Sequence, residues 1–226
     1  MRTDEGLRTN CGTSPASVYS SEEPSSQEPQ REDFPWQDAF RKTSSAPAPF
    51  SKEELEQLVK RARDGDTAAF SQIYEHWQGE LYKYALYILG NRYDAEDAVS
   101  ECFIEAFRGL KNLREPAAFK GWIFRILSIR CKRRIGEFIR ARSTLNVDDF
   151  LFLPSDGPAL DEAGVENVQL LKALEALKPD ERMILILSTL HGYTTKEIAA
   201  ILGRPHGTVS ARLYRTYGKL RKLMEQ

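Results

Sequence analysis

The sequence predicts an all-α protein made of two small helical domains, joined by an acidic flexible linker and preceded by a disordered tail. Three observations support this prediction. From Ser51 onward, apolar residues recur at helical spacings of three and four. Helix caps, glycines and prolines separate these stretches. Two segments, residues 1–50 and 143–166, have biased compositions without such periodicity. The predicted domains are therefore 51–142 and 167–226.

Composition excludes several classes of protein. The chain has 226 residues, of which 41% are hydrophobic and 29% charged, with a formal net charge of -1. Its longest apolar run, Met183 to Leu187, is too short to span a bilayer, so we expect a soluble, cytoplasmic protein without membrane insertion. Cys11, Cys102 and Cys131 are scattered and form no zinc motif, and we expect no metal and no cofactor.

The tail, up to about Pro49, is rich in Ser, Pro, Glu and Gln, and holds five basic and eight acidic residues. This composition is typical of disorder. One stretch differs, because FPWQDAFRK from Phe34 places three aromatics within seven residues. It is either an ordinary aromatic-containing tail or a short helical turn that docks on another surface.

The 51–142 domain opens with two predicted helices. Ser51 and Glu54 form a capping box at the start of the first. Asp66 or Thr67 caps a longer helix with a broad apolar face, which Gly90 ends.

The third predicted helix, DAEDAVSECFIEAF from Asp94, separates two kinds of side chain. The apolar side consists of Ala95, Ala98, Val99, Cys102, Phe103, Ala106 and Phe107. The opposite side is an acidic stripe of Asp94, Asp97, Glu101 and Glu105. Such a stripe is either a solvated face, favoured near a helix N-terminus by the helix dipole, or a docking surface for a basic partner.

After a loop at Gly109 to Pro116, the fourth predicted helix, residues 118–142, mixes aromatics with cations. Between Arg125 and Arg142 there are seven Lys or Arg and one acid. Bases stack on aromatic rings while cations hold phosphates, so this pattern suits single-stranded DNA. Alternatively, Phe119 and Trp122 pack in the core and the basic residues are solvated.

An extended linker follows at 143–166, with six acids and no Lys or Arg. Helical periodicity resumes from Val168 to Leu177. Pro179 then suits the first turn of another helix, which Gly192 ends. We expect these two helices to pack under the final pair in a four-helix domain.

The last thirty residues predict a helix-turn-helix. Thr194 and Glu197 form a capping box, Gly203 suits the left-handed position that ends a helix, and Pro205 opens the next. In that second helix one face is apolar, formed by Val209, Leu213, Tyr217, Leu220 and Met224, which leaves Thr208, Ser210, Arg212 and Arg215 facing outward.

This end of the chain is basic. From Arg204 to Gln226 there are six Lys or Arg against one acid. The second helix of a helix-turn-helix enters the major groove, where such cations meet phosphates. A solvated helix pair is the plainer alternative.

Catalytic motifs are missing from the sequence: we find no P-loop, HExxH, dinucleotide turn or nucleophile elbow, and His76, His191 and His206 are isolated. We therefore do not expect an enzyme.

Four segments together resemble the sigma-70 family of bacterial RNA polymerase specificity subunits, specifically the extracytoplasmic-function (ECF) group. The resemblance covers about Ser51 to Leu223. Its carriers are DAEDAVSECFIEAF at Asp94, FKGWIFRI at Phe119, LKPDERMILIL at Leu177 and YTTKEIAAILGRPHGTVSARLYR at Tyr193.

The resemblance implies a promoter-specific initiation factor. Residues 51–142 would be sigma region 2, which binds core polymerase and melts and reads the -10 element, and 167–226 would be sigma region 4, which reads the -35 element. The partners implied are promoter DNA, the clamp helices of the largest polymerase subunit, the flap of the second-largest subunit and, as a further partner, an anti-sigma factor. The linker would run near the polymerase active site.

The same resemblance implies roles for individual residues. Core polymerase binding falls to Asp94, Asp97, Glu101 and Glu105. Contacts to -10 DNA fall to Asn112, Arg114, Phe119, Lys120, Trp122, Arg125, Ile129, Lys132 and Arg133. Contacts to -35 DNA fall to Arg204, His206, Thr208, Ser210, Ala211, Arg212 and Arg215.

Three positions depart from the family's usual pattern. Ser210 and Ala211 stand where a basic residue and a serine are frequent, and Ile129 stands where many members have Asn. These departures leave the promoter sequence open. The competing function is a stand-alone helix-turn-helix regulator that binds operators as a dimer, which would leave the acidic and aromatic-basic helices without a role.

Overall fold

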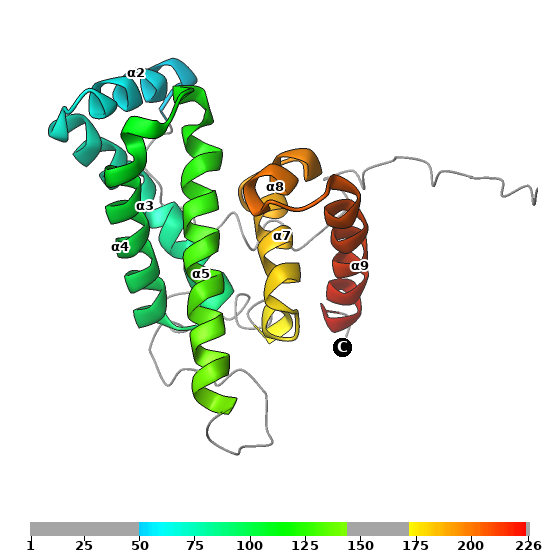
Figure 1. Ribbon diagram of the computed structural model, residues 1–226. Coiled ribbons are helices and arrows are strands. Elements are labelled where there is room, and N and C mark those ends of the chain that lie inside the picture. The colour runs from blue at the N-terminus through cyan, green and yellow to red at the C-terminus, as the bar shows by residue number, and fades with distance from the viewer. Residues whose placement is uncertain (1–49, 144–171, 225–226) are drawn as a thin grey trace, which may run out of the picture.

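The computed structural model describes residues 50–143 and 172–224. The described residues form helices without a strand, as the sequence predicts, in two modules that lie side by side (Figure 1). The N-terminal module (residues 50–143) contains α2 (Lys52–Arg63), α3 (Thr67–Leu89), α4 (Arg92–Gly109), short 3-10 turns at Leu110–Asn112 and Pro116–Ala118, and α5 (Phe119–Ser143). The C-terminal module (residues 172–224) contains α7 (Pro179–Thr189), α8 (Thr195–Leu202) and α9 (His206–Met224).

Local capping signals set most helix boundaries. The predicted Ser51–Glu54 box is present at α2, with the Glu54 backbone N–H donating to Ser51 Oγ at 3.1 Å. Asp66 caps α3, and Gly90 ends it in the left-handed conformation at φ 70°. These three boundaries confirm the predictions from sequence.

The start of α4 differs from the prediction. The helix begins at Arg92, two residues before Asp94, because the Asn91 side chain accepts the Asp94 backbone N–H at 3.1 Å and acts as the N-cap. The predicted loop at Gly109 to Pro116 is present but contains the first 3-10 turn.

The core of the N-terminal module is organised around α3, which packs on α2, α4 and α5. Aromatic rings meet edge to face along it: Trp77 contacts Phe119 and Phe124, and Tyr84 contacts Phe124 at a centroid separation of 5.4 Å. The buried Tyr84 hydroxyl lies 2.7 Å from Ser128 Oγ, so its polar end has a partner.

The C-terminal module is built as predicted around its helix-turn-helix. The Thr194–Glu197 capping box is present, and Gly203 ends α8 at φ 63°. In α9, Val209, Leu213 and Leu220 are buried. Thr216, which the sequence pattern did not single out, is also fully buried, with its hydroxyl donating to the Arg212 carbonyl at 2.8 Å.

The two modules pack directly on each other, which the sequence did not predict. Buried residues of both belong to one continuous apolar cluster. Arg182 of α7 is 1% exposed, and its Nη1 donates to the carbonyls of Tyr87 and Ile88 in the last turn of α3, at 3.3 and 3.0 Å. A cation at the C-terminal end of a helix is favoured by the helix dipole.

His191 is the second buried polar group between the modules. Its side chain is 3% exposed and its ring packs on Phe124 at 4.4 Å and on Tyr84 at 5.9 Å. Burial, reinforced by the positive charge of Lys120, lowers the imidazole pKa to about 3. The nearest carboxylate is Glu80, with Oε2 3.9 Å from His191 Nδ1. The imidazole is therefore neutral at physiological pH.

Some predictions lie outside the described residues. They are the disorder of the 1–50 tail, including the Phe34 stretch, and the flexibility of the acidic 143–166 linker beyond its first residue. Of the helix predicted from Val168 to Leu177, residues 172–175 are described and helical. Across the described ranges, every helix is too short or too polar to cross a membrane.

We expect His191→Gln to remove a pH dependence of stability. Because the folded pKa lies below the unfolded value of about 6.5, this histidine's contribution is complete above pH 6.5 and decreases as the pH falls toward 3. At pH 5 the stability lost through this histidine, relative to neutral pH, is about 2 kcal/mol. Measured by urea unfolding, the free energy of unfolding should fall less between pH 7 and pH 5 for the variant than for the unsubstituted chain. His76→Gln is the control, and equal losses in all three proteins would contradict the assignment.

Candidate nucleic-acid interface

The four predicted acids of α4 face the basic residues of α5. Arg134 lies 3.0 Å from Glu101, 3.2 Å from Asp97 and 3.8 Å from Asp94. Arg130 pairs with Glu105 and lies 3.5 Å from Glu101.

Two arginines therefore face four carboxylates, which leaves this face with an excess of two negative charges. The acids remain 39% to 64% exposed, so each pair contributes only about 0.2–1 kcal/mol. The face is thus both internally paired and open to an external cation.

An apolar patch is present on the outer surface of α3 and α4. Ile104 and Phe107 are each 52% exposed, and Tyr74 of α3 is 41% exposed. Phe107 lies on the predicted apolar side of α4, where its ring contacts Phe70 at 5.0 Å, but half of the residue is open to solvent because the core ends there. Exposed apolar groups near an acidic stripe are typical of a protein-binding surface.

Of the residues predicted to contact -10 DNA, five are exposed, in the loop before α5 and on α5 itself. They are Asn112, Arg114, Arg125, Ile129 and Arg133. Arg133 donates to Glu137 at 2.8 Å, one turn further along α5. Lys132 is half-buried and points toward Asp180 of the other module, at 3.8 Å.

The aromatic pair of α5 divides into two roles. Phe119 is fully buried against Trp77 and Trp122. It therefore packs in the core, the second of the two alternatives given above, and a base cannot stack on its ring in this structure. Trp122 keeps an exposed edge. It also lies against Gly109, where a Cβ would come within 3.3 Å of the Trp122 ring, so the absence of a side chain lets the loop approach. The ammonium of Lys120 sits over the rings of Trp77 and Tyr193 at 5.6 and 5.4 Å.

The residues predicted to contact -35 DNA gather on the turn and the first half of α9. Arg204, His206, Thr208, Ala211 and Arg215 are exposed, and Ser210 and Arg212 are partly exposed. Four of these side chains have partners within the chain, among them Arg215, whose Nε donates to the Ala211 carbonyl one turn back at 3.2 Å. Arg212 and Arg204 donate to Asp180 Oδ2 at 3.0 and 3.2 Å, and the ring of His206 lies 2.9 Å from Thr195 Oγ1 and ties the two helices together.

Tyr214 is a candidate that the sequence reasoning missed. It is 73% exposed, the most open aromatic of α9, and lies three residues after Ala211 on the outer face. The signal was present in the sequence, because Tyr214 falls outside the buried register of Val209, Leu213 and Leu220. An exposed aromatic on a recognition helix offers apolar contact to a thymine methyl group.

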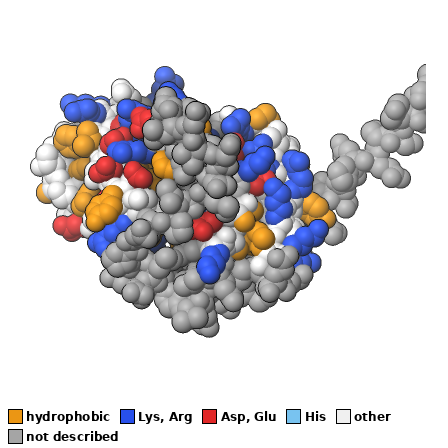
Figure 2. Space-filling view, turned by 90° about the horizontal axis from the view of Figure 1, so that it is seen from below, with side chains coloured by type: hydrophobic (Ala, Val, Ile, Leu, Met, Phe, Trp, Pro, Cys, Tyr) orange, Lys and Arg blue, Asp and Glu red, His pale blue; other side chains and the backbone are white. Residues whose placement is uncertain are grey.

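The two modules carry different charge patterns on their surfaces. Figure 2 shows Lys and Arg side chains gathered on the side formed by α9, whereas acidic and basic side chains adjoin on the side of α4 and α5. The α9 side has the charge expected of a surface that meets phosphates. The charge of the α4 side is suited to binding a protein partner that carries basic side chains.

The family of the chain follows from comparison with known sequences. The family models described as "Sigma-70 region 2" and "Sigma-70, region 4" match residues 73–142 and 167–220, one in each module. The chain is also 31% identical over 172 residues to the ECF RNA polymerase sigma-E factor of Escherichia coli, covering 70% of this chain and 87% of that protein. The chain belongs to the ECF group of the sigma-70 family. The resemblance stated from sequence is confirmed.

Two further relatives are also sigma factors. The ECF RNA polymerase sigma factor SigE of Mycolicibacterium smegmatis is 32% identical over 166 residues, 70% of this chain and 63% of that protein. The RNA polymerase sigma-H factor of Pseudomonas aeruginosa is 28% identical over 187 residues, 77% of this chain and 96% of that protein.

Solved structures show the same fold. CnrH, in complex with the cytosolic domain of CnrY, superimposes with a TM-score of 0.58 at 22% identity, covering 76% of this chain and 97% of that one. The sigma factor RpoE of Bartonella quintana, in complex with the anti-sigma factor NepR, superimposes with a TM-score of 0.54 at 24% identity, covering 69% and 96%. Sigma factors of this family are non-catalytic initiation factors.

The described residues contain no group of three or more His, Cys, Asp or Glu arranged to hold a metal. Cys102 and Cys131 are buried, and burial raises the pKa of the Cys102 thiol to about 12. Both therefore behave as small apolar residues.

Tyr214→Ala should weaken binding to duplex DNA without weakening the fold. Because the ring is largely exposed, the free energy of unfolding should change by less than about 0.5 kcal/mol, whereas affinity for a short duplex with the preferred -35 sequence should fall about tenfold. Tyr217→Ala is the contrasting variant: that ring is half-buried, with its hydroxyl 3.3 Å from Ser188 Oγ. It should lose about 2 kcal/mol of stability. Unchanged affinity for Tyr214→Ala would exclude the contact.

Proposed function

We propose that the chain binds core RNA polymerase and directs promoter-specific initiation, with the C-terminal module reading -35 duplex and the N-terminal module reading melted -10 DNA. The observation that carries this proposal is the division of charge between the modules. One has a basic recognition helix, and the other combines an acidic stripe with an exposed basic face of α5. A stand-alone operator-binding regulator would need only the first.

The boundaries proposed from sequence are retained. Residues 51–142 act as region 2 and 167–226 as region 4, with 143–166 as a linker near the polymerase active site and 1–50 as an N-terminal extension. The protein works in the cytoplasm, where the polymerase is, with no cofactor and no membrane insertion.

For polymerase binding, the surface is the acidic stripe together with the adjacent apolar patch. Its excess of two negative charges attracts the cations of the largest-subunit clamp helices, and Ile104 and Phe107 supply apolar area at the same place. Arg130 and Arg134 would exchange partners as polymerase docks. Because the existing pairs are partly exposed, this exchange costs little. The flap of the second-largest subunit contacts region 4. An anti-sigma factor is a further partner, as NepR is for RpoE of Bartonella quintana.

For -35 DNA, the reading surface is the exposed side of α9. Thr208, Ala211, Tyr214 and Arg215 present hydroxyl, methyl, aromatic and guanidinium groups to the major groove. A bidentate arginine on guanine contributes about 1–3 kcal/mol of discrimination. Since Arg212 is held by Asp180, Arg215 is the better-placed base reader of the two.

For -10 DNA, Asn112 and Arg114 of the loop and Arg125 and Ile129 of α5 lie open to solvent. The loop and the edge of Trp122 would hold a flipped base while the cations take the opened strand. Phe119 supports this surface from below through its contact with Trp122, 6.1 Å between ring centroids.

Charge reversal of the stripe tests the polymerase-binding role. Asp97→Lys with Glu101→Lys should abolish pull-down of core polymerase, because it replaces two attractive carboxylates by cations and repels Arg134. Circular dichroism should remain unchanged. Glu53→Lys with Glu56→Lys, both on α2, makes the same charge change outside the stripe and the apolar patch and should leave pull-down intact. Normal pull-down by the stripe variant would overturn the assignment.

Transcription in vitro tests the function as a whole. With core polymerase and genomic DNA, the chain should produce RNAs whose mapped 5' ends share a two-part upstream element. Arg215→Ala should reduce some promoters more than others, because base reading is sequence-dependent, whereas a phosphate role would reduce all of them equally. A stand-alone regulator would instead shift a labelled operator without polymerase and would not support initiation.

A further inference from the structure

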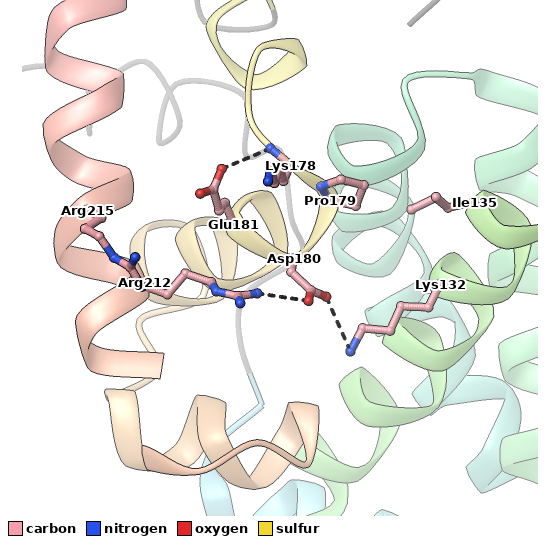
Figure 3. A pocket seen from close by; sticks show the side chains of 8 residues that line it. All are labelled: Lys132, Ile135, Lys178, Pro179, Asp180, Glu181, Arg212 and Arg215. Atoms are coloured by element: carbon pink, nitrogen blue, oxygen red, sulfur yellow. Dashed lines mark hydrogen bonds and ion pairs between the residues drawn. The ribbon is translucent and has the colours of Figure 1, made fainter. Parts of the chain in front are cut away.

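Asp180 is an acidic side chain among arginines that are predicted to contact -35 DNA. It lies in the first turn of α7, where the helix dipole favours a carboxylate. Its Oδ2 accepts a hydrogen bond from Arg204 Nη2 at 3.2 Å and another from Arg212 Nη1 at 3.0 Å. Figure 3 shows the guanidinium of Arg212 directed at this carboxylate, with Lys132 of α5 on its other side, 3.8 Å from Oδ1. One carboxylate therefore holds two of the predicted DNA contacts.

The two arginines belong to different parts of the helix-turn-helix. Arg204 lies in the turn between α8 and α9, and Arg212 lies in the first half of α9. Both hydrogen bonds are contained within the C-terminal module, so they do not depend on where the other module lies. Their support is firm, because residues 181–187 of α7 are buried. A packed helix positions a functional group more precisely than a loop does.

The held arginines still reach the solvent. The side chain of Arg204 is 49% exposed and that of Arg212 is 33% exposed. A guanidinium has five N–H donors in one plane, so a hydrogen bond to Asp180 leaves other donors for a phosphate. Because the carboxylate already restricts the two side chains, they lose less conformational freedom when DNA binds. The arginines are thus preorganised for phosphates at fixed positions.

A carboxylate at this place also has a cost for DNA binding. It cancels part of the positive charge, which lowers affinity for every DNA sequence. Fixed phosphate contacts set the register of a protein on the duplex, and base contacts form only in the correct register. Specificity is the difference between the affinities for matching and other sequences. Asp180 therefore lowers non-specific binding while the arginines that it fixes favour the matching site.

We propose that Asp180 is a positioning residue for -35 recognition: it holds Arg204 and Arg212 as fixed phosphate contacts and so increases the ratio of specific to non-specific affinity. This proposal rests on the proposed function and adds to its reading surface a residue that has the same sign of charge as DNA. Arg215 and Tyr214 then meet the bases in a register that the two held arginines set.

Asp180→Asn tests the proposal, because the amide keeps the size of the side chain and removes the charge that holds the arginines. Affinity of the holoenzyme should be measured on a promoter duplex and on the same duplex with its -35 element scrambled. We expect affinity for the scrambled duplex to rise and the ratio of the two affinities to fall about tenfold. On the scrambled duplex, the slope of log affinity against log salt should steepen by about one, since a released arginine reaches another phosphate.

Two variants serve as controls for charge and for side-chain chemistry. Glu175→Gln removes one negative charge from the same module, from a residue that holds neither arginine, and should leave the ratio and the salt slope unchanged. Asp180→Glu keeps a carboxylate at the same place and should retain most of the ratio. Circular dichroism of all the variants should match that of the unsubstituted chain.

A double-mutant cycle shows whether Asp180 acts through the arginines. In a chain that carries Arg204→Ala and Arg212→Ala, adding Asp180→Asn should not change the ratio further. A further fall in that background would overturn the proposal, as would equal changes of both affinities on Asp180→Asn alone. If the unsubstituted holoenzyme did not prefer the intact -35 element, that result would count against the proposed function instead.

Discussion

A buried guanidinium joins the two halves of this sigma factor. Arg182 is almost fully enclosed, and burial lowers its pKa only to about 10, so it stays charged at neutral pH. Leaving such a charge without hydrogen bonds would be strongly unfavourable. Its donors therefore need the carbonyls at the end of α3, as well as those of Glu175 and Leu177 in its own module. The position of α7, and with it the direction in which α9 faces, follows from this requirement.

Charged side chains also hold helices together within the N-terminal module, between α4 and α5. The acids of α4 are held by two arginines of α5, which fixes the spacing of the two helices, yet two of the four negative charges remain in excess. Internal pairing and the proposed binding of polymerase therefore use the same residues. A face of this kind is stable in the free protein and remains attractive to a basic partner, because exchanging one partly exposed ion pair for another changes little free energy.

Much of the fold was predictable because its signals are local. Capping at Ser51, Asp66 and Thr194 and left-handed glycines at Gly90 and Gly203 depend on residues within one turn, and the structure has all of them. The packing between modules was not predictable, since it depends on contacts such as Arg182 with Ile88, 94 residues apart in the chain. The environments of individual side chains were predictable only in part. The exposure of Arg215 follows from helical periodicity. The burial of Phe119 and the ion pair between Arg212 and Asp180 depend on tertiary packing.

To read both promoter elements at once, as proposed, the two modules must move from contact to positions about 25 base pairs, or roughly 85 Å of duplex, apart. Energy transfer between dyes on exposed positions of the two modules, such as Lys52→Cys and Lys196→Cys, measures this distance directly. The free chain should give a short inter-dye distance, and the complex with core polymerase and promoter DNA a much longer one. The same distance in both states would contradict the account.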